Sequence, residues 1–212
     1  MKKFIPAMNY EFLTPFYDAI LNLIGFGYGQ RVKIVKLLNL KDGEKLLDVG
    51  CGTGSLLIAA KKLHPKISAT GIDIDKRILK IAEEKTEKEN VKINFVETSA
   101  DSLPFKDSSF DTVVSTLAFH HLPFDVKKRA ITKIKRVLKK NGRFLLVDFG
   151  KTDSVWINIF YRIIDFLGIE EATTLKDNIN GKLPILLKQS GFKTTEVALQ
   201  YLGIQYILAT TK

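Results

Sequence analysis

Residues 46–54 read LLDVGCGTG, a strand that ends in an acidic residue and runs into a glycine-rich turn. The apolar run over 45–49 predicts a buried strand containing Asp48, and the residues over 56–63 predict a helix. Three glycines occupy alternate positions between them: Gly50, Gly52 and Gly54. Glycine lets a ligand approach the main chain closely, and the N-terminus of the following helix offers free N–H groups. The stretch therefore predicts a ligand-binding turn.

The spacing of these glycines differs from the dinucleotide-binding fingerprint. GxGxxG would need a glycine at Ser55, whereas Gly54 completes GxGxG. Asp48 beside the helix start suits a ligand with an ammonium group better than a pyrophosphate. Asp73 follows nineteen residues after Gly54, at the end of the second predicted strand, where doubly wound sheets place a carboxylate that binds ribose hydroxyls. A chance glycine turn with a helix-capping aspartate is the weaker interpretation, because strand, helix and Asp73 occur together.

Strands and helices alternate through the middle of the chain. Further strands are predicted over 67–72, 91–96, 112–117 and 143–149, and helices over 78–88 and 126–139, the last closed by Asn141-Gly142. Continuous apolar strands in this alternation indicate a parallel sheet covered on both faces. The ends differ: helices are predicted over 154–168 and 175–189, and closing strands over 191–199 and 204–210. We expect one domain over 1–212, with an N-terminal helical cover (1–44), a ligand-binding core (45–150) and a substrate cover with closing strands (151–212).

Composition limits the classes of function. The chain has 212 residues, of which 45% are hydrophobic and 26% charged, as in ordinary globular proteins. The single cysteine, Cys51, excludes a disulfide framework and a cysteine-based zinc site, and no metal is expected. No signal peptide is recognisable, and no uncharged run reaches the roughly 18–20 residues of a membrane-spanning helix. We expect a cytoplasmic protein that can also lie at the membrane periphery.

Charge and apolar surface point to possible partners. The net charge is +10, and residues 127–143 hold nine basic side chains and no acidic one. This balance favours anionic partners such as nucleic acid, phospholipid headgroups or acidic proteins, or it keeps a soluble protein monodisperse. Residues 155–169 are mostly apolar and suit a lid over an apolar substrate, a surface resting on a membrane, a dimer face or plain core packing.

Several motifs resemble the class I S-adenosylmethionine (SAM) dependent methyltransferases, in particular the type 11 group that includes ubiquinone and menaquinone biosynthesis enzymes. The matching stretches are LLDVGCGTGSL at 46–56, TGIDID at 70–75, LPFKDSSFDTVVSTLAFHHL at 103–122 and VLKKNGRFLLVD at 137–148. The resemblance implies a Rossmann-like, doubly wound α/β fold with a seven-stranded, mostly parallel sheet of order 3-2-1-4-5-7-6 and an antiparallel last strand. It also implies SAM as cofactor and S-adenosylhomocysteine as product.

The resemblance assigns cofactor contacts to particular residues. Asp48 and the glycine loop, including Cys51 as a small packing residue, would hold the methionine part of SAM. Asp73 would bind the ribose hydroxyls, and Ile74 would pack on adenine. The sulfonium side would be lined by Ser115, Thr116 and Leu117.

The adenine contact departs from the family pattern. Family members often carry an aspartate that reaches the adenine amino group at the position of Ser99, which here precedes Ala100. Ser99 can accept one hydrogen bond, and Asp101 is the second candidate for this contact.

The chemistry needs few residues. Methyl transfer from a sulfonium is an in-line displacement that depends mainly on alignment, and a base is needed only where the nucleophile carries a proton. His120 and His121 follow the fourth predicted strand, and His120 is the candidate base, with a structural role as the alternative. Tyr17 and Tyr10, in the N-terminal segment, are candidates to border the methyl group or simply to pack.

The expected function is methyl transfer to a small, lipophilic or membrane-associated acceptor, such as a quinone precursor or a lipid headgroup. Two alternatives stay open: an RNA or protein methyltransferase, favoured by the basic residues at 127–143, and a non-catalytic SAM-binding protein of the same fold. Residues 115–118 read STLA, without the Asn-Pro-Pro-Tyr type motif common in base-amino methyltransferases, and no added RNA-binding module is recognisable. The acceptor atom and the oligomeric state stay open.

Overall fold

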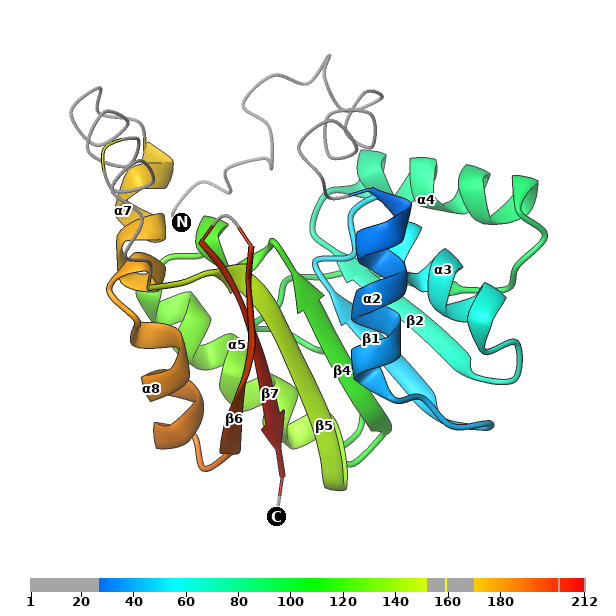
Figure 1. The fold of residues 1–212 in the computed structure, drawn as a ribbon. Coiled ribbons are helices and arrows are strands. Elements are labelled where there is room, and N and C mark those ends of the chain that lie inside the picture. The colour runs from blue at the N-terminus through cyan, green and yellow to red at the C-terminus, as the bar shows by residue number, and fades with distance from the viewer. Residues whose placement is uncertain (1–26, 152–158, 160–169, 202, 212) are drawn as a thin grey trace.

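The computed structural model describes residues 27–151, 159, 170–201 and 203–211 (Figure 1). The predictions for Tyr10 and Tyr17, and nearly all of the apolar segment 155–169, lie outside these residues. Within the described ranges, no helix has the length and apolar content that crossing a bilayer requires.

Seven strands form one sheet of order β3-β2-β1-β4-β5-β7-β6. They are β1 (Lys45–Val49), β2 (Ser68–Asp73), β3 (Asn94–Glu97), β4 (Phe110–Thr116), β5 (Leu138–Phe149), β6 (Lys193–Tyr201) and β7 (Ile204–Thr210). Strands β1 to β5 are parallel, and β7 runs antiparallel to both β5 and β6. The predicted fold and strand order are confirmed.

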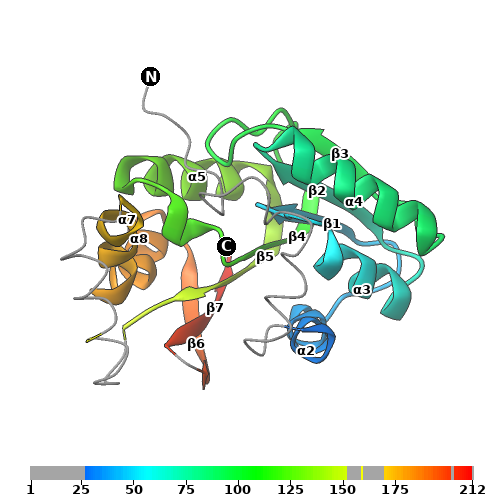
Figure 2. The same ribbon diagram turned by 90° about the horizontal axis from the view of Figure 1, so that it is seen from above.

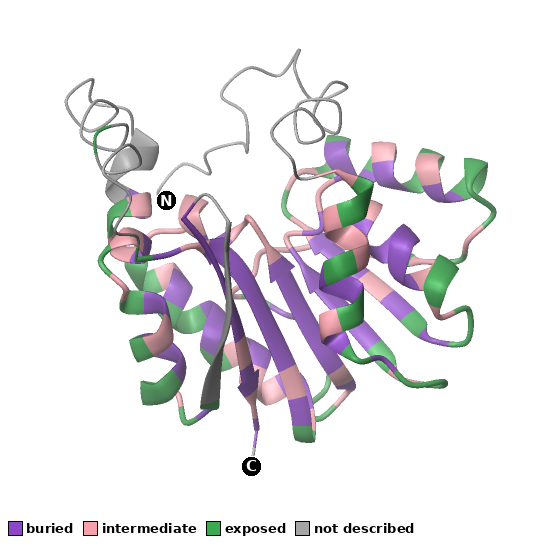
Figure 3. Cartoon of the chain, in the orientation of Figure 1, coloured by how far each residue is buried: buried purple, intermediate pink, exposed green. Residues whose placement is uncertain are grey.

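Helices cover both faces of this sheet. They are α2 (Tyr28–Leu38), α3 (Ser55–Leu63), α4 (Lys76–Lys88), α5 (Phe124–Val137), α7 (Glu170–Ile179) and α8 (Lys182–Gln189), with a short 3-10 helix, η2 (Phe119–His121). Figure 2 shows α2 and α3 on one face and α5 with α8 on the other. The strands are largely buried, whereas the helices expose their outer sides (Figure 3).

The period of two in β5 divides the core into two clusters. Phe144 and Leu146 pack with α5 and α8, whereas Leu145 and Val147 pack with α2 and α3. A strand that is apolar on both sides is what a sheet covered on both faces requires. Because β1 to β5 run parallel, their carboxyl ends lie along one edge of the sheet.

Three predicted boundaries are wrong, each for a local reason. The helix α5 ends at Val137 because Leu138 already pairs with Phe110 in the sheet, and Asn141, at φ 60°, is a turn within β5 and no helix stop. The strand β3 begins only at Asn94, since the N–H of Val91 still bonds the end of α4. The single helix predicted over 175–189 is divided into α7 and α8 at Gly181, whose φ of 71° interrupts it.

Candidate active site

The glycine turn after β1 has the backbone that its sequence predicts. Gly50, Gly52 and Gly54 have φ values of 75°, 52° and 70°, in the left-handed region that favours glycine. A Cβ on Gly50 would lie 2.5 Å from Cβ of Ala118, in the turn that follows β4. The glycine turn is therefore packed closely against the turn that follows β4.

Asp73 forms hydrogen bonds with the segments that follow β1, β2 and β3. The N–H of Gly52 donates to Oδ2 of Asp73 at 3.0 Å, and the N–H of Asp75 donates to Oδ1 at 3.1 Å. The carbonyl of Asp73 accepts from the N–H of Thr98 at 3.0 Å. Burial raises the pKa of the Asp73 carboxyl, although the N–H donors of Asp75 and Gly52 oppose this shift. Asp73 thus lies between the glycine turn and the turn after β3.

Asp48 is a buried carboxyl group that lacks a hydrogen-bond partner for one of its two oxygens. Its Oδ1 has no hydrogen-bond partner among the described residues. Burial, together with the nearby charge of Asp73, raises the pKa of Asp48 to about 8. A buried polar atom without a partner is costly, so this oxygen fits a cationic group of a ligand. Ile74, the next residue after Asp73, keeps 41% of its surface exposed and offers an apolar platform beside the carboxylate.

These features fit SAM group by group. An ammonium group matches the unpartnered oxygen of Asp48, two ribose hydroxyls match the carboxylate of Asp73, and a flat base matches Ile74. Thr116 Oγ1, at the end of β4, is likewise buried without a partner in the described part of the chain.

Other predicted cofactor residues have structural partners. The hydroxyl of Ser115 donates to the carbonyl of Val49 at 2.7 Å and ties β4 to β1. Leu117 leaves the strand with φ 52°, and its N–H donates to the carbonyl of Val147 at 2.8 Å. Cys51 is buried, and burial raises the pKa of its thiol well above the ordinary range, in agreement with its interpretation as a packing residue.

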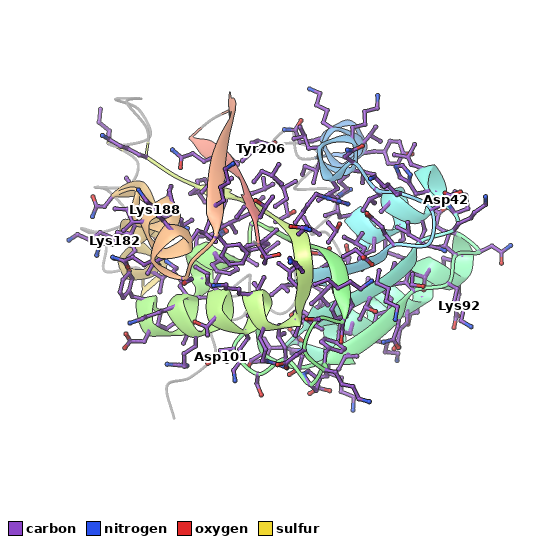
Figure 4. All side chains as sticks on the ribbon, turned by 90° about the horizontal axis from the view of Figure 1, so that it is seen from below. Asp42, Lys92, Asp101, Lys182, Lys188 and Tyr206 are labelled. Carbon is purple, nitrogen blue, oxygen red and sulfur yellow. The ribbon has the colours of Figure 1, made fainter. Side chains whose placement is uncertain are left out.

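Ser99 and Asp101 form one hydrogen-bonded unit in the turn after β3. The Ser99 hydroxyl donates to Oδ1 of Asp101 at 2.7 Å, and Nε of Arg129 donates to Oδ2 at 2.9 Å. Asp101 is labelled beside α5, which carries Arg129, in Figure 4. Ala100, between the two residues, is partly buried against the core.

His120 is paired with a buried aspartate that sequence reasoning missed. Nδ1 of His120 lies 2.9 Å from Oδ1 of Asp148, whose side chain is fully buried. The Asp148 carboxylate also accepts from the backbone N–H groups of Phe119 (2.8 Å), His120 (3.3 Å) and Phe149 (2.8 Å). Burial would raise the pKa of Asp148, but His120 and these donors outweigh it and hold that pKa below its ordinary value.

The ionised state of Asp148 sets the tautomer of His120. A carboxylate only accepts, so Nδ1 must donate, and Nε2 is left as the acceptor when the ring is neutral. Nε2 makes no hydrogen bond with any residue in the described ranges. The sequence did contain a signal for Asp148: like Asp48 and Asp73, it stands near the carboxyl end of a central parallel strand.

His121 has a different environment. Its ring stacks on His120 with centroids 3.9 Å apart. Burial, assisted by the neighbouring His120, lowers the pKa of His121 to about 3. His121 is therefore neutral at working pH and supports the position of its neighbour.

The predicted basic surface at 127–143 is largely engaged in internal contacts. Lys127 is fully buried, and its Nζ donates to the carbonyl of Thr174 at 2.5 Å and to Oδ1 of Asn178 at 2.7 Å. Five more of the nine basic residues bond acidic side chains or carbonyls: Arg129, Lys135, Arg136, Lys139 and Arg143. The predicted basic surface therefore carries less free positive charge than its sequence indicates, because six of its nine basic side chains, on α5 and β5, are bonded internally.

Comparisons with known proteins agree with this geometry. Residues 46–142 match the family described as a methyltransferase domain. Demethylmenaquinone methyltransferase of Thermus thermophilus is 32% identical over 163 residues, which cover 74% of this chain and 73% of the relative. The enzyme of the same name from Lactobacillus johnsonii is 30% identical over 211 residues, covering 90% and 86%. A SAM-dependent methyltransferase structure from Aquifex aeolicus shares the fold, with a TM-score of 0.66 at 19% identity, covering 86% of this chain and 89% of that one.

The fold and the site thus define a SAM-dependent methyltransferase. The chain belongs to the class I SAM-dependent methyltransferases, in the group typified by ubiquinone and menaquinone biosynthesis enzymes, and SAM is its methyl donor.

Proposed function

We propose that this enzyme methylates a small, lipophilic acceptor of the demethylmenaquinone kind, at the cytoplasmic periphery of a membrane. The relatives named for that substrate support the proposal. The observation that carries it is the His120–Asp148 pair at the carboxyl end of β4 and β5. Such a pair suits an acceptor whose hydroxyl must lose a proton before it reacts. A quinol, which is the reduced form of a quinone, carries such hydroxyl groups.

Cofactor binding is assigned to the residues gathered at the same edge. Asp48 takes the ammonium group, and the turn from Gly50 to Gly54 takes the rest of the methionine part. Asp73 accepts from the ribose hydroxyls, and Ile74 packs on adenine. Thr116 and Leu117 border the sulfonium, whereas Ser115 supports them through its bond to Val49.

The chemistry is divided between the cofactor and His120. Bound SAM supplies an electrophilic methyl group on a positively charged sulfur. Asp148 holds the Nδ1–H of His120, so that Nε2 accepts the proton of the acceptor's hydroxyl. Removal of this proton by His120 would leave on the acceptor the electron pair that takes the methyl group. Tyr17 and the apolar residues 155–169 are proposed to cover this reaction from water.

A partition assay with tritiated SAM tests the acceptor class. The purified enzyme is given separate pools of reduced lipid extract, RNA, protein and small molecules, and the label is counted in each. We expect label in the organic phase. Label in RNA alone would support the nucleic-acid alternative and contradict the proposal, and label confined to the water-soluble pool would exclude a lipophilic acceptor.

The same assay tests the base. The His120→Ala variant should lose about 10²–10⁴-fold in kcat, the usual contribution of general base catalysis, with little change in SAM affinity. His64→Ala is the matched control, because His64 lies at the far end of α3. Equal rates for all three proteins would show that no base acts at His120.

A further inference from the structure

We propose that a buried cation, Lys127, balances the charge of the Asp148 carboxylate through the amide of Asn178. Because this charge is already balanced, His120 need not become an imidazolium ion and stays in the neutral form that accepts a proton. Lys127 and Asn178 act on the reaction through Asp148, so they are positioning residues and not catalytic ones. This role deepens the proposed function, since it rests on His120 as the base of that reaction.

One oxygen of Asp148 is shared by the histidine and by helix α7. Oδ1 of Asp148 lies 2.9 Å from Nδ1 of His120 and accepts from Nδ2 of Asn178 at 3.2 Å. The same oxygen accepts from the N–H of Phe149 at 2.8 Å. Asp148 and Asn178 are both buried, so bulk water does not screen the charges around this oxygen.

The other end of the amide contacts the cation. Nζ of Lys127 donates to Oδ1 of Asn178 at 2.7 Å and to the carbonyl of Thr174 at 2.5 Å. An ammonium group only donates and a carboxylate only accepts, so the amide has its oxygen toward Lys127 and its NH₂ toward Asp148. Hydrogen bonds in such a chain polarise and strengthen one another. The amide therefore carries the influence of the cation to Asp148.

Charge balance links this chain to the base. A buried carboxylate is costly unless a positive charge or hydrogen-bond donors compensate it, and both Lys127 and His120 can carry that charge beside Asp148. Burial lowers the pKa of Lys127 to about 8, and the charge of Asp148 opposes this shift, so the ammonium group persists at pH 7. A proton on His120 would then add a second positive charge to a poorly screened cluster, which is unfavourable.

The other titratable groups around the cluster do not supply the balancing charge. Asp177 favours the Lys127 ammonium group and Lys182 disfavours it, and these two residues pair with each other at 2.7 Å. His121 is neutral at pH 7, because burial, with the charge of His120, lowers its pKa to about 3. Lys127 is the one lysine or arginine that is buried in the described part of the chain.

A purely structural role is the competing explanation for the same contacts. A chain of bonds that merely fastened α7 to the sheet would affect unfolding and leave the protonation of His120 unchanged. If the chain balances Asp148, His120 must take over as the countercharge once Lys127 and Asn178 are replaced by apolar residues. The two explanations therefore differ in the charge of one ring in a folded protein.

Nuclear magnetic resonance measures that charge. The full chain, labelled with ¹⁵N in its three histidines, is compared at pH 7 with the double variant Lys127→Met, Asn178→Leu, which strands no ammonium group. The His120 signals are those lost in His120→Ala. We expect an unprotonated Nε2 in the wild type, and a ratio of imidazolium to neutral ring at least about tenfold higher in the double variant. Lys127→Met alone should shift the ratio in the same direction.

The rate of methyl transfer to the reduced lipid extract gives a second readout. The double variant should lose about tenfold in kcat at pH 7 and recover toward the wild type at pH 9, where His120 is neutral in both proteins. Its affinity for S-adenosylhomocysteine should be unchanged. Lys133→Met on α5 and Asn180→Leu just after α7 are the matched controls, because both side chains lie outside the chain of bonds. Thermal melts check that each variant is folded.

Two results would contradict this charge balance. One is an unchanged ratio of imidazolium to neutral His120 in the folded double variant and in Lys127→Met. The other is a loss of kcat that is equal at every pH, or that persists when the double variant is combined with His120→Ala. Full activity of His120→Ala itself would refute the proposed base instead, and the resonance measurement, which needs no acceptor, would still decide the charge balance.

Discussion

At the scale of single residues, Asp48 makes a prediction about protons. Its folded pKa of about 8 lies above the ordinary 3.8, so the cofactor-free protein holds a proton there between about pH 4 and pH 8. The unfolded chain has lost that proton, and this group's contribution to stability falls as pH rises through the window. A cofactor ammonium group needs the ionised form, so binding at pH 6.5 should release about one proton.

Calorimetry in two buffers of different ionisation enthalpy measures that release. Asp48→Asn should bind more weakly and release none, whereas Asp42→Asn, an exposed control, should behave as the wild type. Proton release that persists in Asp48→Asn would assign the shifted pKa to another group.

Gly50 makes a second prediction at this scale. Gly50→Ala forces a side chain into φ 75° and places its Cβ 2.5 Å from Ala118. We expect a loss of about 1–3 kcal/mol in the free energy of unfolding and weaker SAM binding. Gly50→Ala with Ala118→Gly removes the clash but not the backbone strain, and should recover part of both.

Urea titrations compare these variants with Gly29→Ala. Gly29 lies in α2 with no atom within 4 Å of an added Cβ, so alanine there should be neutral or slightly stabilising. A double variant no better than Gly50→Ala would show that contact with Ala118 is unimportant.

At the scale of elements, α7 is fixed to the site by a buried chain of polar groups. Nζ of Lys127 donates to Asn178 Oδ1, and Nδ2 of Asn178 donates to Oδ1 of Asp148 at 3.2 Å. Because Lys127 only donates and the ionised Asp148 only accepts, the orientation of the Asn178 amide is fixed. Asn178→Leu should cost about 3–5 kcal/mol by stranding a buried ammonium group, and Lys127→Met with Asn178→Leu should recover most of it.

The pH dependence of stability identifies Lys127 independently. Burial lowers its pKa to about 8, despite the opposing charge of Asp148. Below pH 8 the folded protein bears the full free-energy cost of burying the Lys127 ammonium group. This cost is relieved as pH rises from about 8 toward the ordinary lysine pKa of 10.5. Denaturation at pH 7.5 and pH 9.5 should show a gain in the wild type relative to the double variant. An equal response would mean that Lys127 does not titrate in this range.

What the sequence predicted at this scale was local. Periodicity and the glycine turn predicted β1, α3 and β2. The strand order was predicted by the family resemblance alone. The break at Gly181 and the extension of β5 to Leu138 depended on backbone conformation and pairing with Phe110, which no periodicity contains. Asp148 and Lys127 were missed because their partners are 28 to 51 residues away.

At the scale of the whole molecule, the net charge is +10. Within the basic segment 127–143, however, internal bonds leave only some of the positive side chains free to meet a partner. Lys128 and Lys140 are the exposed lysines of the 127–143 segment. We expect salt-sensitive binding to anionic liposomes that weakens by roughly fivefold per residue in Lys128→Ala and Lys140→Ala, since each cation near such a surface contributes about 1 kcal/mol.

Cosedimentation with vesicles checks this expectation. Lys92→Ala is the control, since Lys92 lies beside β3 and away from α5 (Figure 4). Binding to neutral vesicles that equals binding to anionic ones would contradict an electrostatic contact.

The central claim is that this edge of the sheet holds SAM through the glycine turn and Asp73. Calorimetry of the wild type and Asp73→Ala with S-adenosylhomocysteine and NAD tests it most directly. Each hydrogen bond to a charged carboxylate contributes about 1.5–3 kcal/mol, so Asp73→Ala should bind at least tenfold more weakly while it stays folded, and NAD should not compete. An unchanged dissociation constant in Asp73→Ala, or tighter binding of NAD by the wild type, would contradict the account.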